Sequence, residues 1–224
     1  MLIQPLVFVG QTTETDCCGQ SAIVKSLKLD SLELTLLGLA GDEQAEKRVH
    51  GGPDRALCHY PREHYDFWMT QYPELKTIFK LSAFGENLST LGMLENNVHI
   101  GDVYQWGEAW IQVTQPRSPC FKLNGLTGLS DFSLIMQNSG KTGWLYRVIK
   151  TGIVSSNDPL ILMNRSSDLS IEEVVNIAFH QPFDEEETLR LLRAAGLSAS
   201  WTVTMLKRLQ NKAVENFNRR LFAE

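Results

Sequence analysis

Cys120 is the residue whose type and surroundings most readily support chemistry in this chain. It lies in the segment QPRSPCFKL (115–123), directly after a strand-like segment at 109–114. The two prolines of this segment fix φ and remove backbone donors, which predicts a rigid turn. Arg117 and Lys122 bring positive charge near the sulfur, and such neighbours typically lower the pKa of a thiol from about 8.5 to roughly 3.5 to 7.5. The pattern alone leaves two alternatives, a functional thiolate and a cysteine that packs as a small hydrophobe.

A glycine turn with polar neighbours precedes Cys120 in the segment HGGPDRAL (50–57). A turn at Gly51 and Gly52 exposes backbone amides, and Arg55 supplies a guanidinium with bidentate geometry, so that together they can bind an anionic group. His50 would either line this pocket or be a structural histidine bonded to the turn.

A second glycine-containing segment, FGENL (84–88), carries a carboxylate and an amide. The amide of Asn87 can donate and accept hydrogen bonds at the same time. Glu86 would either orient Arg55 or take part in acid–base chemistry. The alternative for Arg55 is a surface ion pair with Asp54 or Glu86.

Together, the three segments closely resemble the MOSC domain family, the fold related to the C-terminal part of molybdenum cofactor sulfurases, and in particular its short bacterial YiiM-like members. The resemblance extends through the last 60 or so residues, which resemble the three-helix extension of those members. It implies a mainly β fold with helices, a MOSC-type β-barrel at 1–163 and a small three-helix domain at 164–224. It also implies a molybdenum cofactor held by its pyranopterin phosphate, and reduction of N-hydroxylated compounds such as N-hydroxylated purines and amidoxime-like substrates.

Carried over residue by residue, the resemblance makes Cys120 the catalytic residue and the molybdenum ligand. Asn87 would read an edge of the pterin. The full set of expected cofactor-binding residues is His50, Gly51, Gly52, Asp54, Arg55, Glu86, Asn87, Arg117, Ser118 and Lys122.

Two other functions remain open for the same residues. Cys120 would carry a persulfide if the chain were a sulfur carrier, or the chain would be a non-catalytic binding module for molybdenum cofactor or for pyridoxal phosphate. A soft thiolate suits a redox metal, which favours the reductase.

Composition excludes several classes of function. The net charge of −5 argues against binding to a nucleic-acid polymer, which requires an excess of Lys and Arg. No apolar run reaches the roughly 18 residues that a membrane helix needs, so we expect a cytoplasmic protein. No G-x-G-x-x-G fingerprint and no iron–sulfur cysteine set occur, so a separate flavin or iron–sulfur protein is the expected electron donor. A homodimer is a further possibility.

The other three cysteines, Cys17, Cys18 and Cys58, form no C-x-x-C pair. The first two lie in a polar stretch and are expected to be incidental thiols. Cys58 lies in an apolar, strand-like segment and is expected to be a packing residue.

The predicted elements must position these segments. Residues 103–106 and 109–114 flank a Gly-Glu pair suited to a two-residue hairpin. A helix is predicted from Pro61, with an aromatic face that belongs to the core, and another over 130–136.

Three amphipathic helices are predicted in the C-terminal part. Ser170 begins the first through a capping box. Asp184 begins the second, which would bury Leu189, Leu192 and Ala195 and end at Gly196. The third spans 198–209 and would dock on the barrel through Trp201, Met205 and Leu209.

Overall fold

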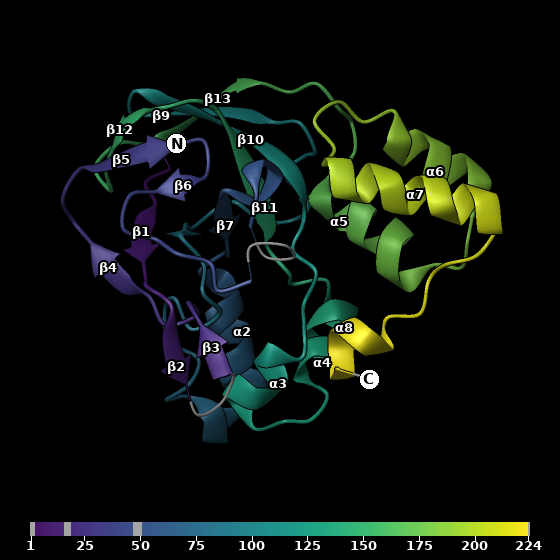
Figure 1. The fold of residues 1–224 in the computed structure, drawn as a ribbon, viewed down its shortest axis with the longest axis horizontal. Coiled ribbons are helices and arrows are strands. Elements are labelled where there is room, and N and C mark those ends of the chain that lie inside the picture. The colour runs from purple at the N-terminus through teal and green to yellow at the C-terminus, as the bar shows by residue number, and fades with distance from the viewer. Residues whose placement is uncertain (1–2, 16–18, 47–50, 224) are drawn as a thin grey trace.

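A curled, strand-rich sheet is the main element of the protein, in a computed structural model that describes residues 3–15, 19–46 and 51–223. Within these residues the largest sheet has eight strands, in the order β13-β9-β10-β11-β7-β8-β1-β4. All neighbouring strands are antiparallel except β7 and β8. The sheet curls into a half-barrel (Figure 1). Its strands are β1 (Leu6–Val9), β4 (Ser26–Lys28), β7 (Leu57–His59), β8 (Leu88–Ser89), β9 (Val103–Trp106), β10 (Ala109–Pro116), β11 (Trp144–Lys150) and β13 (Leu160–Asn164).

Two smaller sheets complete the β structure of the described residues. One contains β12 (Gly152–Val154), β5 (Leu32–Thr35) and β6 (Gly38–Leu39), and the other pairs β2 (Thr13–Thr15) with β3 (Gly19–Ser21).

The predicted hairpin is confirmed. Strands β9 and β10 pair across the Gly107–Glu108 turn, with Ala109 opposite Trp106. Gly107 has φ of 54°, a left-handed conformation that glycine adopts without strain. Strand β10 continues two residues beyond the predicted end, through Pro116, and its pairing with β11 shifts register between Val113 and Gln115. This hairpin delivers the chain to Cys120.

Helices cover one end of the half-barrel and bury an aromatic cluster. The helix predicted from Pro61 is α2 (Glu63–Gln71), and the one predicted over 130–136 is α4 (Phe132–Ser139). Tyr65 and Trp68 pack with Phe79, Phe84 and Phe132, so the aromatic face is core, as predicted. The remaining short elements of this part are η1 (Pro53–Arg55), η2 (Pro73–Leu75) and α3 (Lys122–Thr127).

The C-terminal helices begin where their caps predict. Ser170 forms the full capping box of α5 (Ile171–Val175), which continues as the π-helical turn η3 (Asn176–His180). The Asp184 side chain accepts from Glu187 N at the start of α6 (Glu185–Leu192).

The predicted apolar face of α6 is wrong by one residue. Thr188 and Leu191 are buried, whereas Leu189 is 40% exposed, and the helix ends at Leu192 rather than at Gly196. The predicted stripe that begins at Leu189 and the buried stripe that begins at Thr188 have the same helical spacing. Burial of Thr188 becomes possible because its hydroxyl donates to the carbonyl oxygen of Asp184 at 2.5 Å.

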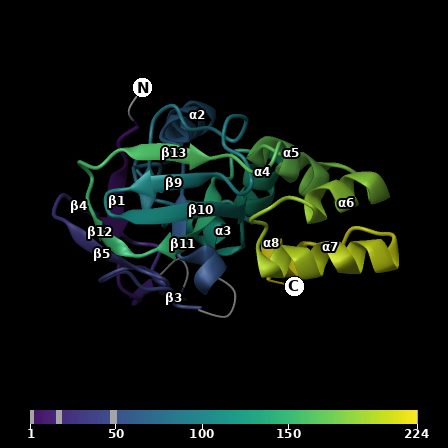
Figure 2. The same cartoon turned by 90° about the horizontal axis from the view of Figure 1, so that it is seen from above.

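The third predicted helix is α7 (Ala199–Asn211), which docks on the sheet as expected. Ser198 caps it and its backbone N–H also donates to Thr114 O at 3.1 Å. Trp201 and Met205 belong to the same core cluster as the strands, whereas Leu209 is half-buried and lies outside that cluster, which corrects its predicted role. Figure 2 shows α7 and α6 together at one end of the sheet.

Two glycines allow this close docking. Gly101 and Gly196 both have positive φ, and a Cβ built on Gly196 would lie 2.6 Å from the Cα of Gly101. Side chains at either position would therefore separate the helices from the sheet. No described helix is long and apolar enough to cross a bilayer.

Candidate functional site

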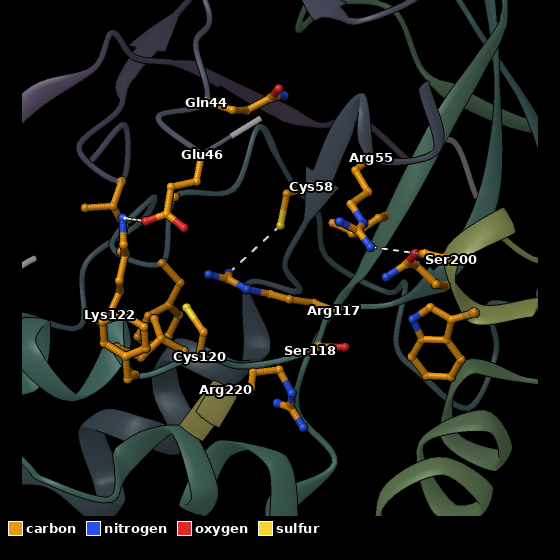
Figure 3. Close-up of a pocket in the computed structure, with 18 of the residues that line it drawn as sticks. Gln44, Glu46, Arg55, Cys58, Arg117, Ser118, Cys120, Lys122, Ser200 and Arg220 are labelled. Atoms are coloured by element: carbon orange, nitrogen blue, oxygen red, sulfur yellow. Dashed lines mark hydrogen bonds and ion pairs between the residues drawn. The ribbon is translucent and has the colours of Figure 1, made fainter. Parts of the chain in front are cut away.

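A cavity of about 810 Å³ opens between the sheet and the C-terminal helices. The end of β10 and the loop before α3 form one wall, and α7 with the segment after it forms the opposite wall. Figure 3 looks into this cavity. Of the sequence-predicted residues it brings together six, namely Arg55, Asn87, Arg117, Ser118, Cys120 and Lys122.

Cys120 lies on the loop between β10 and α3 and is half-buried at the cavity wall. Its carbonyl oxygen accepts a hydrogen bond from Leu123 N at 2.9 Å, which starts the first turn of α3. The preceding strand is fixed by its ladder with β11 up to Pro116. The end of β10 and the start of α3 therefore hold the Cys120 thiol in place, as the predicted rigid turn requires.

Arg117 is the cation closest to the centre of this site. Figure 3 shows its guanidinium between Cys58 and Cys120, and Nη1 donates to Cys58 Sγ at 3.9 Å. Burial lowers the pKa of Arg117, but the charges that Cys58, Cys120 and Glu86 can carry outweigh burial and raise it above its ordinary value. Arg117 is therefore charged at any physiological pH.

Cys58 also lines the cavity, and its assignment as a packing residue needs correction. Strand β7 buries Leu57 and His59 on one face, so the residue between them points the opposite way, toward Arg117. Burial raises the pKa of the Cys58 thiol, and the opposing effect of the nearby Arg117 is smaller. The sulfur of Cys58 is therefore protonated at neutral pH. The strand-like character of residues 57–59 was the sequence signal, because in a strand Cys58 must face the opposite side from Leu57 and His59.

Arg55 reaches the cavity from η1 and links the sheet to α7. Its Nη2 donates to Ser200 Oγ at 2.8 Å. Burial lowers the pKa of Arg55, and Asp54 opposes this effect. Asp54 itself accepts from Arg147 Nη2 and from the Ala199 backbone N–H, both at 2.8 Å. Asp54 thus anchors the start of α7.

Besides Asp54 and Glu86, two expected cofactor-binding residues that the structure describes do not line the cavity. Gly51 and Gly52 precede η1 outside the lining. His50 lies outside the described residues. Their expected contacts with a ligand remain predictions.

Glu86 is fully buried behind the cavity wall. Its Oε1 accepts from Tyr65 Oη at 2.7 Å and from Ser82 N at 2.8 Å. Burial raises the pKa of this carboxyl, and those hydrogen bonds oppose the shift. Glu86 is therefore bonded to Tyr65 and Ser82 rather than to Arg55, which corrects the expectation that it orients Arg55.

Asn87 lines the cavity, but its amide is engaged by the protein. Its Nδ2 donates to Phe8 O at 3.2 Å and to Asp42 Oδ2 at 2.8 Å, and its Oδ1 accepts from Cys58 N. An amide has two N–H donors, so only acceptor capacity remains for a ligand. Reading a pterin edge with this amide would require one of these bonds to break.

Lys122 and Ser118 complete the predicted set. Lys122 Nζ forms an ion pair with Glu46 at 2.8 Å and donates to Gln20 O at 3.1 Å, so that it ties strand β3 and the segment of Glu46 to α3. Ser118 is half-buried and lines the cavity. The guanidinium of Arg220, which sequence reasoning missed, lies on the same side of the cavity.

No group of three or more His, Cys, Asp or Glu side chains within residues 3–15, 19–46 and 51–223 is arranged to hold a metal ion.

Comparison with known proteins gives the family of this chain. The MOSC domain model matches residues 46–161, which span Arg55, Cys58 and the Cys120 loop. The chain belongs to the MOSC domain family. A second model, described as the YiiM-like 3-alpha helix domain, matches residues 169–212 of this MOSC protein. The resemblance inferred from the three sequence segments is thereby confirmed.

Individual relatives agree with this assignment. The MOSC protein is 56% identical over 207 residues to Protein YiiM of Escherichia coli (strain K12), covering 92% of each chain. It is 35% identical over 160 residues to a protein of Gibberella moniliformis (strain M3125 / FGSC 7600) named Reductase, covering 69% of this chain and 28% of that protein. The crystal structure of YiiM from Escherichia coli superposes with a TM-score of 0.88 at 49% identity, covering 99% of both chains.

Proposed function

We propose that this MOSC protein is a molybdenum-cofactor-dependent reductase of N-hydroxylated compounds, with Cys120 as the molybdenum ligand. The observation that carries the proposal is the convergence of Cys120 and the Arg117 guanidinium in one cavity. The name Reductase of one relative is in keeping with a redox activity. N-hydroxylated purines and amidoxime-like compounds are the proposed substrates.

The residues of the cavity fit such a cofactor. Its volume of about 810 Å³ is within the roughly 300 to 1,000 Å³ common for ligand sites. A guanidinium has five N–H donors, and the hydrogen bond of the Arg117 side chain within the described residues is a long one to Cys58 Sγ. Remaining donors of Arg117 are available for the anionic end of a pterin phosphate.

Each side chain of the cavity has a distinct role in this proposal. Cys120 would hold the metal through its sulfur, and Arg117 would stabilise the negative charge of sulfur and phosphate. Arg55 contributes a second guanidinium from the side of α7. The bound cofactor supplies two-electron oxygen-atom acceptance, which these side chains lack.

The overall reaction determines how many electrons and protons must be supplied. Conversion of an N–OH group to N–H consumes two electrons and two protons and releases one water. In this proposal the substrate and the protons enter through the cavity, and the chain contributes binding and orientation.

The direct test uses protein purified from a host that makes the cofactor. We expect close to one molybdenum per chain by elemental analysis, and reduction of an N-hydroxylated purine when an artificial low-potential reductant is present. Protein without molybdenum and without turnover under these conditions would count against the reductase.

Replacing Arg117 by Lys is expected to reduce molybdenum content about tenfold or more. Lysine keeps the charge but loses the planar fork, and a hydrogen bond to a charged group contributes about 1.5 to 3 kcal/mol, or roughly a tenfold to hundredfold change in affinity. Arg55→Lys is expected to act in the same direction. Arg193→Lys, at an exposed position after α6, is the matched control. Normal occupancy in both cavity variants would mean that these arginines serve only the protein structure.

A further inference from the structure

The chain after α7 returns from the helices to the Cys120 loop. The short helix α8 (Asn218–Phe222) lies beside α3 and α4 in Figures 1 and 2. Leu221 is buried, and its carbonyl oxygen accepts from Asn124 Nδ2 at 2.8 Å and from Ser133 Oγ at 2.9 Å. Five residues are too few to form a stable helix alone, so these contacts hold α8 in place.

Arg220 of α8 holds the residues on both sides of Cys120. Its guanidinium Nη1 donates to the carbonyl oxygen of Pro119, and its own carbonyl oxygen accepts from Phe121 N at 2.9 Å. Its Nη2 donates to Gln137 Oε1 on α4. The peptide groups before and after Cys120 are thus fixed by one residue that is 100 positions later in the sequence.

The environment keeps Arg220 in this position and charged. Its guanidinium stacks 5.2 Å from the ring centroid of Phe179 and 5.1 Å from that of Phe217. Burial lowers the pKa of Arg220 to about 10, with Cys120 and Glu215 opposing the shift. At neutral pH the guanidinium is therefore a cation at the cavity wall next to Cys120.

We infer that α8 completes the Cys120 site and that Arg220 is the positioning residue that fixes the Cys120 loop. Residues 218–222 lie outside the segments matched by the two family models, 46–161 and 169–212. The consequence for metal binding rests on the proposed function, whereas the positioning of Cys120 does not. The C-terminal part then contributes a wall and a cation to the cavity.

The test compares Arg220→Gln, Arg220→Lys and the matched control Arg193→Gln. Glutamine keeps N–H donors without charge, and lysine keeps the charge with a single donor group. On metal-free protein, deuterium uptake is measured for a peptide covering 117–124 and for one covering 103–113. The rate of alkylation of Cys120 by iodoacetamide is followed by mass spectrometry at one fixed pH.

In Arg220→Gln we expect several-fold faster deuterium uptake at 117–124 and several-fold faster alkylation of Cys120, because the Pro119 carbonyl loses its hydrogen bond and the loop is released. Arg220→Lys is expected to show both changes to a smaller degree, because lysine keeps a charged donor. Deuterium uptake by peptide 103–113 should be unchanged in both Arg220 variants, which separates release of the Cys120 loop from unfolding of the protein. The control should match the unmodified protein in all readouts.

Unchanged deuterium uptake at 117–124 and an unchanged rate of Cys120 alkylation in Arg220→Gln would overturn the inference. So would an equal change in peptide 103–113 of both Arg220 variants, because Arg220 would then serve the whole fold. Molybdenum content is measured in parallel and is expected to fall several-fold in Arg220→Gln. If the unmodified protein never contains molybdenum while the loop readouts respond as expected, the proposed function fails and the positioning role stands.

Discussion

Replacement of Cys120 by Ser is expected to abolish molybdenum retention while leaving the fold intact. A hydroxyl is a much poorer ligand than a thiolate for a soft redox metal. Loss of even an outer partner of a metal ligand costs about 10-fold to 100-fold in affinity, so loss of the ligand itself should exceed that range. The fold should tolerate the change because the loop is held by backbone hydrogen bonds at Pro119, Phe121 and Leu123. Elemental analysis and thermal unfolding measure the two effects separately.

Cys58→Ser is the discriminating partner of this experiment, because both thiols line the same cavity. We expect the Cys58 variant to retain molybdenum. Burial raises the pKa of Cys58, and a protonated thiol is a weak metal ligand. Equal molybdenum content in the Cys120→Ser variant and in the unmodified protein would show that the ligand has been misassigned. If neither protein contains metal but alkylation of Cys120 blocks sulfur transfer, the persulfide carrier is the better description.

The sequence predicts best those features that short-range chemistry determines. The hairpin at 107–108 follows from a glycine turn between two alternating segments, and the start of α5 follows from Ser170 and Glu173. The three segments were sufficient to indicate the family because their residue types and their order resemble its motifs. The placement of Arg117 beside Cys120 follows from their separation of three residues on one loop.

Features set by packing between distant segments were not predictable. The buried stripe of α6 was displaced by one residue because a threonine satisfied its hydroxyl within its own helix. The amide of Asn87 was expected to face a ligand but is taken up by Phe8 and Asp42. Nothing in the local pattern of residues 217–222 indicates that Arg220 holds the loop of Cys120, since the contact spans 100 residues.

The shared core also limits what a domain boundary means in this protein. Ile171, Leu191 and Trp201 belong to the same cluster as the strands of the half-barrel. The division at 163–164 stays a prediction, because one continuous core joins the two segments. A cavity between them can therefore be rigid enough to orient a cofactor.

Purified protein is expected to show no turnover with NADH alone. Each reduction consumes two electrons, and these 224 residues contain no dinucleotide fingerprint and no cysteine set for an iron–sulfur cluster. The proposal is that a separate flavin or iron–sulfur protein docks transiently near the Cys120 face, with an interface below about 1,200 Å². Turnover with NADH should appear when cell extract is added.

Variants on the surface of α7 test whether the electron-donor protein docks on this helix. Val203 is 51% exposed and Leu206 is 53% exposed, on the helix that forms one wall of the cavity. Docking of a donor protein there would bury both side chains. Val203→Glu with Leu206→Glu should therefore lower turnover with NADH and extract several-fold, but leave turnover with the artificial reductant unchanged. NADH-driven turnover by the purified chain would refute the need for a donor, and an equal loss with both reductants would place the defect in the site itself.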